Sequence, residues 1–136
     1  MVLVDTSIII DFINNNRFKK EITTLLESKE FSTTEMIIME VLQGIKDDKT
    51  YDKIKTFLES LPLVEVKYED FLEAANIYRT CRKRGITIRK SIDCIIAAIA
   101  INNNLELFSI DRDFDNIRKH FELLRYNENL RLVDLS

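Results

Sequence analysis

The chain has 136 residues, of which 46% are hydrophobic, and a formal net charge of -3. This length predicts a single domain, residues 1–136, with one hydrophobic core. The acidic balance argues against a general nucleic-acid coat protein, which would be basic, but it is compatible with an enzyme whose acids gather at a metal site. With 2 glycines and 1 proline, the sequence contains no Gly-rich phosphate loop and no linker.

The sequence also bears on the cellular compartment. It contains no run of 18 apolar residues, and no basic segment precedes the apolar residues that follow Met1. We therefore expect a cytoplasmic protein that does not contact a membrane. The two cysteines, Cys81 and Cys94, lack metal-ligand spacing and are too few for a disulfide framework, which favours a reducing compartment.

The first predicted element is a short buried strand at residues 1–4, which leads directly into Asp5. In open parallel sheets, ligands bind just outside the carboxyl ends of the strands, and Asp5 stands at such an end. Capping of a following helix is an equally simple role for this aspartate. Its role therefore depends on whether other acids join it.

After this strand, amphipathic helices alternate with short apolar strands. The spacing of apolar residues predicts helices near 18–26, 34–46, 51–61, 71–85, 92–99 and 114–120. Further strands are predicted near 30–33, 63–66, 105–109 and 130–133. This alternation is typical of an α/β fold with a parallel sheet.

Three later carboxylates occupy unusual positions. Glu40 lies inside an otherwise apolar helical segment, where an unpaired carboxylate is rare. Asp93 shares a helical face with small alanines, which leave space beside it. Asp111 follows a predicted strand, as Asp5 does, with Asp113 two residues further on. A cap, a surface charge or an ion pair would explain any one of these acids, but together they predict a cluster.

A cluster of carboxylates at one end of a sheet needs a cation, because the acids would otherwise repel one another and their pKa values would rise. Oxygen ligands without nearby His or Cys favour Mg²⁺ or Mn²⁺, ions that serve phosphoryl chemistry. The single histidine, His120, lies in a predicted late helix, which disfavours zinc and leaves no Ser/His/Asp triad.

Four acidic motifs occur in order along the chain: Val4-Asp5-Thr6-Ser7 with Asp11, Glu40 with Gln43-Gly44-Ile45, Ser91-Ile92-Asp93 with the following Ile96–Ala100, and Ser109–Phe114. In these motifs the chain resembles the PIN-domain ribonucleases, and most closely the VapC-type toxins of toxin–antitoxin pairs. The resemblance implies a three-layer α/β/α PIN-like domain with a parallel sheet in the order 3-2-1-4-5. It also implies a Mg²⁺- or Mn²⁺-dependent endoribonuclease that acts on RNA, a small antitoxin as its partner, and a homodimer.

The resemblance carries the family's acids onto this chain as catalytic residues: Asp5, Glu40, Asp93 and Asp111. Asp5, Asp93 and Asp111 are the predicted metal ligands. We favour Asp111 over Asp113 because it comes first after the strand, in which case Asp113 would cap the next helix.

Hydroxyl and basic residues near these motifs are candidates for supporting roles. Thr6, Ser7 and Ser109 could hold a bridging water or a substrate phosphate, although capping of their own helices is the simpler explanation. The only dense basic run lies just before Asp93, and from it we predict RNA-phosphate contacts for Arg82, Lys83 and Arg89. A solvated helix end with favourable cations explains part of the same run.

Two other classes of function remain open at this point. A phosphoaspartate-type phosphotransferase or a receiver domain would also place an Asp after the first strand. The haloacid-dehalogenase type has a second Asp two residues on, where this chain has Ser7, and a receiver needs further acids and a late lysine. A non-catalytic binding module of the PIN fold is the third possibility, and the four retained acids argue against it.

Overall fold

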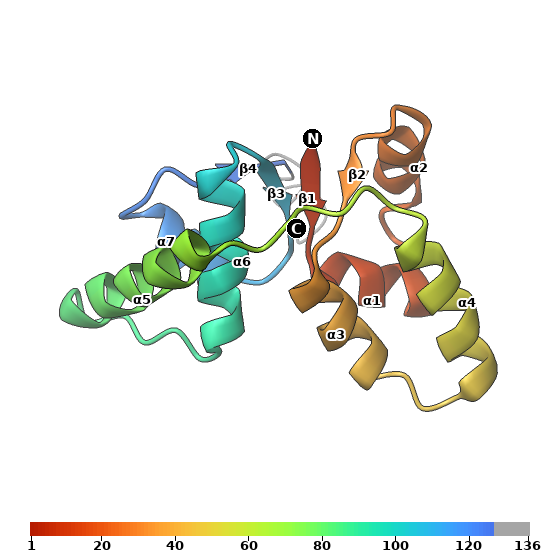
Figure 1. Cartoon of the computed structure of the whole chain (residues 1–136), viewed down its shortest axis with the longest axis horizontal. Coiled ribbons are helices and arrows are strands. Elements are labelled where there is room, and N and C mark those ends of the chain that lie inside the picture. The colour runs from red at the N-terminus through yellow and green to blue at the C-terminus, as the bar shows by residue number, and fades with distance from the viewer. Residues whose placement is uncertain (127–136) are drawn as a thin grey trace.

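The computed structural model describes residues 1–126 and has the predicted α/β architecture (Figure 1). In chain order its elements are β1 Val2–Val4, α1 Thr6–Asn14, α2 Lys19–Glu27, β2 Phe31–Ser32, α3 Glu35–Gln43, α4 Asp48–Glu59, α5 Tyr68–Lys83, α6 Ser91–Asn102, β3 Glu106–Phe108, α7 Asp113–Arg118 and β4 Leu124–Arg125. Within this part of the chain, no helix is long and apolar enough to cross a membrane.

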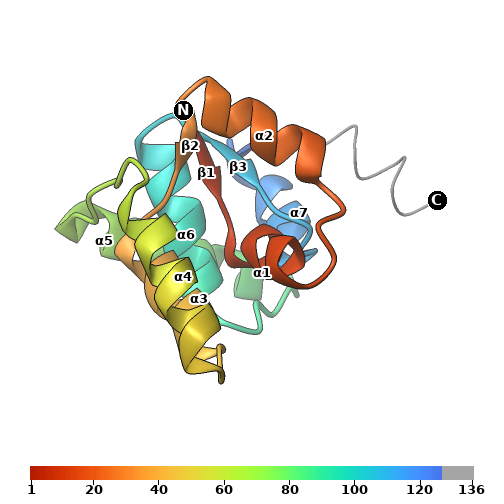
Figure 2. The same ribbon diagram turned by 90° about the vertical axis from the view of Figure 1, so that its right-hand side faces the viewer.

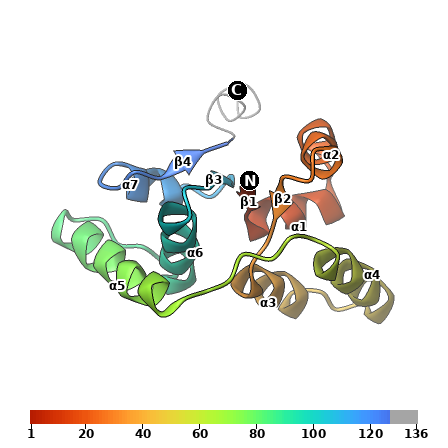
Figure 3. The same ribbon diagram turned by 45° about the horizontal axis from the view of Figure 1, so that its top comes forward.

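The strands form a parallel sheet in the order β2-β1-β3-β4, and helices cover both of its faces. Helices α1 to α4 gather on one side and α5 to α7 on the other, as Figure 1 and Figure 3 show. This is the three-layer arrangement that the sequence predicts. Right-handed crossovers produce it, because connections that run in opposite directions along a parallel sheet place their helices on opposite faces.

The predicted five-strand order differs in detail from the sheet that forms. Segment 63–66 makes only one parallel bridge, between Thr33 and Leu63, and continues as irregular chain towards α5. Pro62 lacks the N–H that a longer ladder at this edge would use. The sequence analysis also missed β4, and the strand it predicts at 130–133 lies outside the described residues.

The hydrophobic core lies around β1 and α6. All three residues of β1 are buried, and α6 is buried continuously from Asp93 to Ala100. A helix that is apolar all round belongs in the interior, which explains why α6 is enclosed by neighbouring elements. Viewed from the side in Figure 2, β1 runs between β2 and β3 and passes directly into α1. The core therefore anchors β1, which ends immediately before Asp5, and α6, which carries Asp93 in its first turn.

A buried arginine ties the last described strand to the segment between β3 and α7. Arg125 Nη2 donates to the backbone carbonyl of Ser109 at 2.7 Å, and Nη1 lies 2.7 Å from Asp115 Oδ1. The guanidinium carbon also lies 5.9 Å from the centre of the Phe114 ring. Arg125 is only 8% exposed, so its guanidinium and its bond to the Ser109 carbonyl are shielded from water, while the Asp115 side chain is 45% exposed. They hold the segment that carries Asp111.

We therefore expect Arg125→Ala to lower the free energy of unfolding by about 2–3 kcal/mol, because it removes a buried cation that makes charge-assisted hydrogen bonds. The control is Arg112→Ala, since Arg112 is exposed and belongs to the same segment. That change should alter stability by less than about 0.5 kcal/mol. Urea unfolding of both variants measures the difference, and equal effects would contradict a special role for Arg125.

Candidate active site

The register of the central strands places the first candidate acid. Val4 pairs with Phe108, and the Asp5 N–H donates to the Phe108 carbonyl at 2.9 Å. Asp5 and Ser109 therefore leave the sheet side by side, at the carboxyl ends of β1 and β3. Asp5 is also the N-cap of α1, so the capping role and the position at the strand end belong to the same residue. Its side chain is buried, with 3% of the residue exposed.

Hydroxyl groups surround the Asp5 carboxylate. Ser109 Oγ donates to Asp5 Oδ2 at 2.8 Å and Ser7 Oγ donates to the same atom at 2.9 Å. Ser109 Oγ in turn accepts from the Asp111 N–H at 3.0 Å. Burial raises the pKa of Asp5 despite these hydrogen bonds, which act in the opposite direction. Both serines thus hydrogen-bond to Asp5, and Ser109 also hydrogen-bonds to the backbone of Asp111. Helix capping does not explain these positions.

Glu40 lies where the two halves of the molecule meet, the half that contains α1 to α4 and the half that contains α5 to α7. Helix α3, which carries it, contacts both α1 and α6. Thr6 Oγ1 donates to Glu40 Oε1, and Lys90 Nζ lies 3.5 Å from Oε2. Burial acts to lower the pKa of Lys90, but the surrounding carboxylates, Asp93 first and then Glu40, outweigh it and raise that pKa. Lys90 therefore stays charged beside the acids.

Three aspartates come closest together. Asp93, Asp111 and Asp113 each offer a carboxylate oxygen, and these atoms lie within 4.8 Å of one another. The Oδ2 atoms of Asp93 and Asp113 are buried and have no hydrogen-bond partner. Burial raises the pKa of Asp93 to about 7, and the charges of Asp111 and Asp5 add to that rise. Such a set of unsatisfied, mutually repelling oxygens fits a hard divalent cation.

Asp111 and Asp113 do not divide their roles as the sequence predicts. The N-cap of α7 is Arg112, which makes no side-chain capping bond, and Asp113 is the first residue of the helix. Asp111 Oδ1 instead accepts from the Asp113 N–H at 2.9 Å. The expected cap is therefore wrong, because the helix begins one residue earlier than a capping Asp113 requires. Both acids face the same space as Asp93.

The site thus unites most of the residues that the sequence singles out. The three-aspartate group includes Asp113, whereas Asp5 lies beside it, bound to the serines. Asp11, by contrast, pairs with Arg17 at 2.6 Å and caps the turn after α1.

The predicted basic residues separate into two places. Arg89 lies on the acids, with Nε 3.5 Å from Asp113 Oδ2 and Nη2 3.7 Å from Asp111 Oδ1. Arg82 lies on α5, where its guanidinium carbon is 5.6 Å from the centre of the Tyr78 ring, and Lys83 is exposed at the end of the same helix. The sequence analysis did not pair Lys90 with Glu40. The position of Lys90, immediately before the helix that carries Asp93, was the signal that this lysine lies near the acids.

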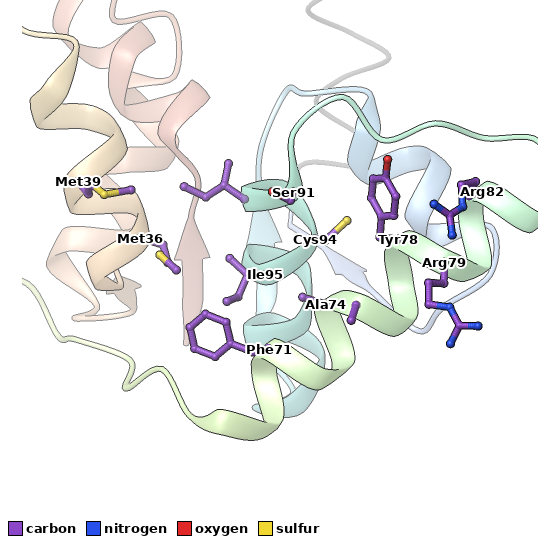
Figure 4. A pocket seen from close by; sticks show the side chains of 12 residues that line it. Met36, Met39, Phe71, Ala74, Tyr78, Arg79, Arg82, Ser91, Cys94 and Ile95 are labelled. Atoms are coloured by element: carbon purple, nitrogen blue, oxygen red, sulfur yellow. The ribbon is translucent and has the colours of Figure 1, made fainter.

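A large groove opens beside the acidic site. It has a volume of about 560 Å³ and lies between α3 and α5, with α6 as its floor (Figure 4). Its lining is mainly apolar and includes Met36, Met39, Phe71 and Ile95. Arg79 and Arg82 line the α5 side, as Figure 4 shows. The groove shares helix α6 with Asp93, so the floor of the groove and one side of the acidic site belong to the same helix.

Comparison with known proteins resolves the family. Residues 2–120 match the family model described as PIN domain. Ribonuclease VapC11 of Mycobacterium tuberculosis is 36% identical over 124 residues, which cover 88% of this chain and 92% of that protein. Ribonuclease VapC1 of Methanocaldococcus jannaschii is 29% identical over 127 residues, which cover 91% of this chain and 81% of its own.

Solved structures confirm the fold. The VapBC complex of Salmonella typhimurium matches with a TM-score of 0.74 at 16% identity, over 91% of this chain and 94% of that one. VapC20 of Mycobacterium tuberculosis, a toxin that cleaves the sarcin–ricin loop, matches with a TM-score of 0.66 at 15% identity, over 89% and 96%. A receiver domain or phosphoaspartate enzyme finds no support in these matches. The resemblance seen in the four acidic motifs is confirmed, and the chain belongs to the PIN-domain family, among the ribonucleases of the VapC type.

Proposed function

We propose that this protein is a metal-dependent endoribonuclease and the toxin component of a VapBC-type toxin–antitoxin pair. The convergence of Asp93, Asp111 and Asp113 carries the proposal, because their oxygens lie within 4.8 Å of one another at the end of a parallel sheet. The VapC ribonucleases to which the chain is similar support the same chemistry. Retention of these acids argues against a non-catalytic module.

The acidic group fits Mg²⁺ or Mn²⁺. Asp93, Asp111 and Asp113 would hold the ion, and Asp5 would join them from the neighbouring strand end. When bound, such an ion lowers the pKa of a coordinated water and neutralises charge on the phosphate of the substrate. Glu40 lies beside this group between a hydroxyl donor and Lys90, where it can accept a proton near the reacting phosphate.

Ser7 and Ser109 position the acids. Their hydroxyls hold Asp5 Oδ2 in place, and Ser109 also accepts from the Asp111 backbone. They therefore act through the carboxylates. Thr6 has the same role towards Glu40, because its hydroxyl donates to Glu40 Oε1.

The proposed partners follow from the family. The substrate is RNA, and restraint of a cytoplasmic nuclease would come from a small antitoxin. VapBC complexes such as that of Salmonella typhimurium support this pairing. An antitoxin can inhibit by laying an amphipathic helix in an apolar groove and by placing a cation among the acids. A homodimer of this chain completes the proposed assembly.

Cleavage should depend on the carboxylates. We expect Asp5→Asn, Glu40→Gln and Asp93→Asn each to lower the rate of RNA cleavage by about 10²-fold or more, because an amide keeps the shape but loses the charge that binds the ion. The control is Asp52→Asn, an exposed acid of α4, which should cleave normally. A fluorogenic RNA assay with Mg²⁺, Mn²⁺ or EDTA measures this. Near-normal cleavage by Asp93→Asn would exclude the proposed site.

The same assay separates the two acids of the fourth motif. We expect Asp111→Asn to abolish cleavage, as the sequence predicts. Asp113→Asn should also lower the rate by about tenfold or more, since its buried Oδ2 belongs to the three-acid group. If Asp113→Asn cleaved normally, Asp113 would not be a ligand. If only Asp113→Asn were inactive, the preference for Asp111 would be wrong.

Stability should depend on pH through Asp93. Its pKa is about 7 in the folded protein against 3.8 unfolded, so the folded state binds more protons between these values. Without divalent ions, this contribution is complete below about pH 4 and is lost as pH rises through about 7. Asp93→Asn should therefore be more stable than the original protein at pH 8, by up to roughly 4 kcal/mol, but not at pH 4. Urea unfolding at both pH values tests this, and saturating Mg²⁺ should remove the advantage.

The end of α5 should contribute to RNA binding. Arg82→Gln with Lys83→Gln should weaken RNA affinity without changing the cleaved sequence, because phosphate contacts carry no sequence information. The slope of log K against the logarithm of the salt concentration should become less steep by about 0.7 for each phosphate contact removed. The double variant Lys53→Gln with Lys55→Gln, on exposed positions of α4, is the control. Equal affinity and slope in both variants would assign Arg82 and Lys83 to a solvated helix end.

A further inference from the structure

Arg89 rests on the acidic group from the solvent side. Its Nε lies 3.5 Å from Asp113 Oδ2 and its Nη2 lies 3.7 Å from Asp111 Oδ1. The Arg89 side chain is 72% exposed, whereas those of Asp111 and Asp113 are 17% and 8% exposed. An exposed surface cation thus lies against two of the three acids of the group, Asp111 and Asp113.

The contact between Arg89 and these acids is loose. Both distances exceed the range of about 2.7–3.2 Å for an N–H···O hydrogen bond, and Asp113 Oδ2 has no hydrogen-bond partner. Ion pairs with one exposed partner are weak, because water competes for the charge and the long side chain loses freedom. The guanidinium therefore offsets part of the negative charge of Asp111 and Asp113 without making a close hydrogen bond to either.

The backbone on either side of Arg89 is anchored. Ile88 is 2% exposed and belongs to the core, and Lys90 is the N-cap of α6. Lys90 also has its own acid, with Nζ 3.5 Å from Glu40 Oε2. Arg89 can therefore leave the acids by rotation of its side chain alone, while Lys90 stays in place.

We propose that Arg89 is a displaceable counter-ion that occupies the acidic site until a divalent cation replaces it. This inference rests on the metal site of the proposed function. A divalent ion bound to Asp113 Oδ2 would be a near neighbour of the Arg89 guanidinium, and the two cations would repel. The ion can bind all three carboxylates directly, which the loose guanidinium does not. The work of moving Arg89 lowers the apparent affinity for the ion and sets the concentration at which the site is loaded.

Magnetic resonance can observe this displacement directly. The side-chain Nε–H signal of Arg89 is identified by its absence from Arg89→Gln. On titration with Mg²⁺ it should move to the position of a solvated arginine, with the same midpoint as the backbone amide of Asp93. An Arg89 signal that stays unchanged while the Asp93 amide titrates would overturn the proposal.

Metal affinity and thermal stability give a second test. Mn²⁺ should bind Arg89→Gln about two- to fivefold more tightly than the original protein, the range expected from losing one exposed ion pair. Arg84→Gln, an equal change of charge at the exposed end of α5, should bind within twofold of the original. Arg89→Gln should also melt at a lower temperature without divalent ions, but at an equal temperature in saturating Mn²⁺. A structural ion pair would lower both melting temperatures equally and so overturn the displacement.

The outcomes separate this inference from the proposed function. If the original protein binds neither Mn²⁺ nor Mg²⁺, the metal site fails and the displacement fails with it. If the original protein binds Mn²⁺ while Arg89→Gln behaves like Arg84→Gln, the metal site stands and only the role of Arg89 is overturned. Calorimetric titration at one ionic strength makes these comparisons without a measurement of RNA cleavage.

Discussion

Repulsion between carboxylates buried at one end of a parallel sheet is the constraint around which this molecule is arranged. The register of β1 with β3 brings Asp5 next to Ser109, and the chain then turns Asp111 and Asp113 towards the same space. Burial removes the water that would screen these charges. The groups that contact these carboxylates directly reduce that repulsion: hydroxyl donors, a backbone N–H and two cations.

The two halves of the fold contribute different parts of this arrangement. Asp5 and Glu40 come from the side of the sheet covered by α1 to α4, and the three-aspartate group comes from the α5 to α7 side. The halves meet where α3 contacts α6, and Lys90 reaches from the start of α6 to Glu40. A rigid apolar helix such as α6 holds its first turn steady, so the acids keep their spacing although they repel.

The proposed metal-dependent function would therefore come at a cost in folding stability. The raised pKa of Asp93 reflects that cost, because burial and the neighbouring carboxylates make its charged form unfavourable in the folded protein. Lys90 and Arg89 offset part of the cost from two neighbouring positions, one paired with Glu40 and the other resting loosely on Asp111 and Asp113. Arg125 contributes stability in a different way, because it holds the backbone at Ser109, where the segment that carries Asp111 and Asp113 begins.

Local pattern alone determined much of this protein. The apolar strand before Asp5, the helical spacing of the apolar residues and the order of the acidic motifs predicted the α/β fold and the PIN family, because periodicity and strand-end acids are properties of short segments. Long-range packing decided the rest. Segment 63–66 became a single bridge at the sheet edge. Asp113 joined Asp93 and Asp111 when α7 began one residue earlier than a capping Asp113 requires, and Arg89 came to lie on Asp111 and Asp113. These outcomes depend on register and on side-chain distances between distant segments, which no local pattern encodes.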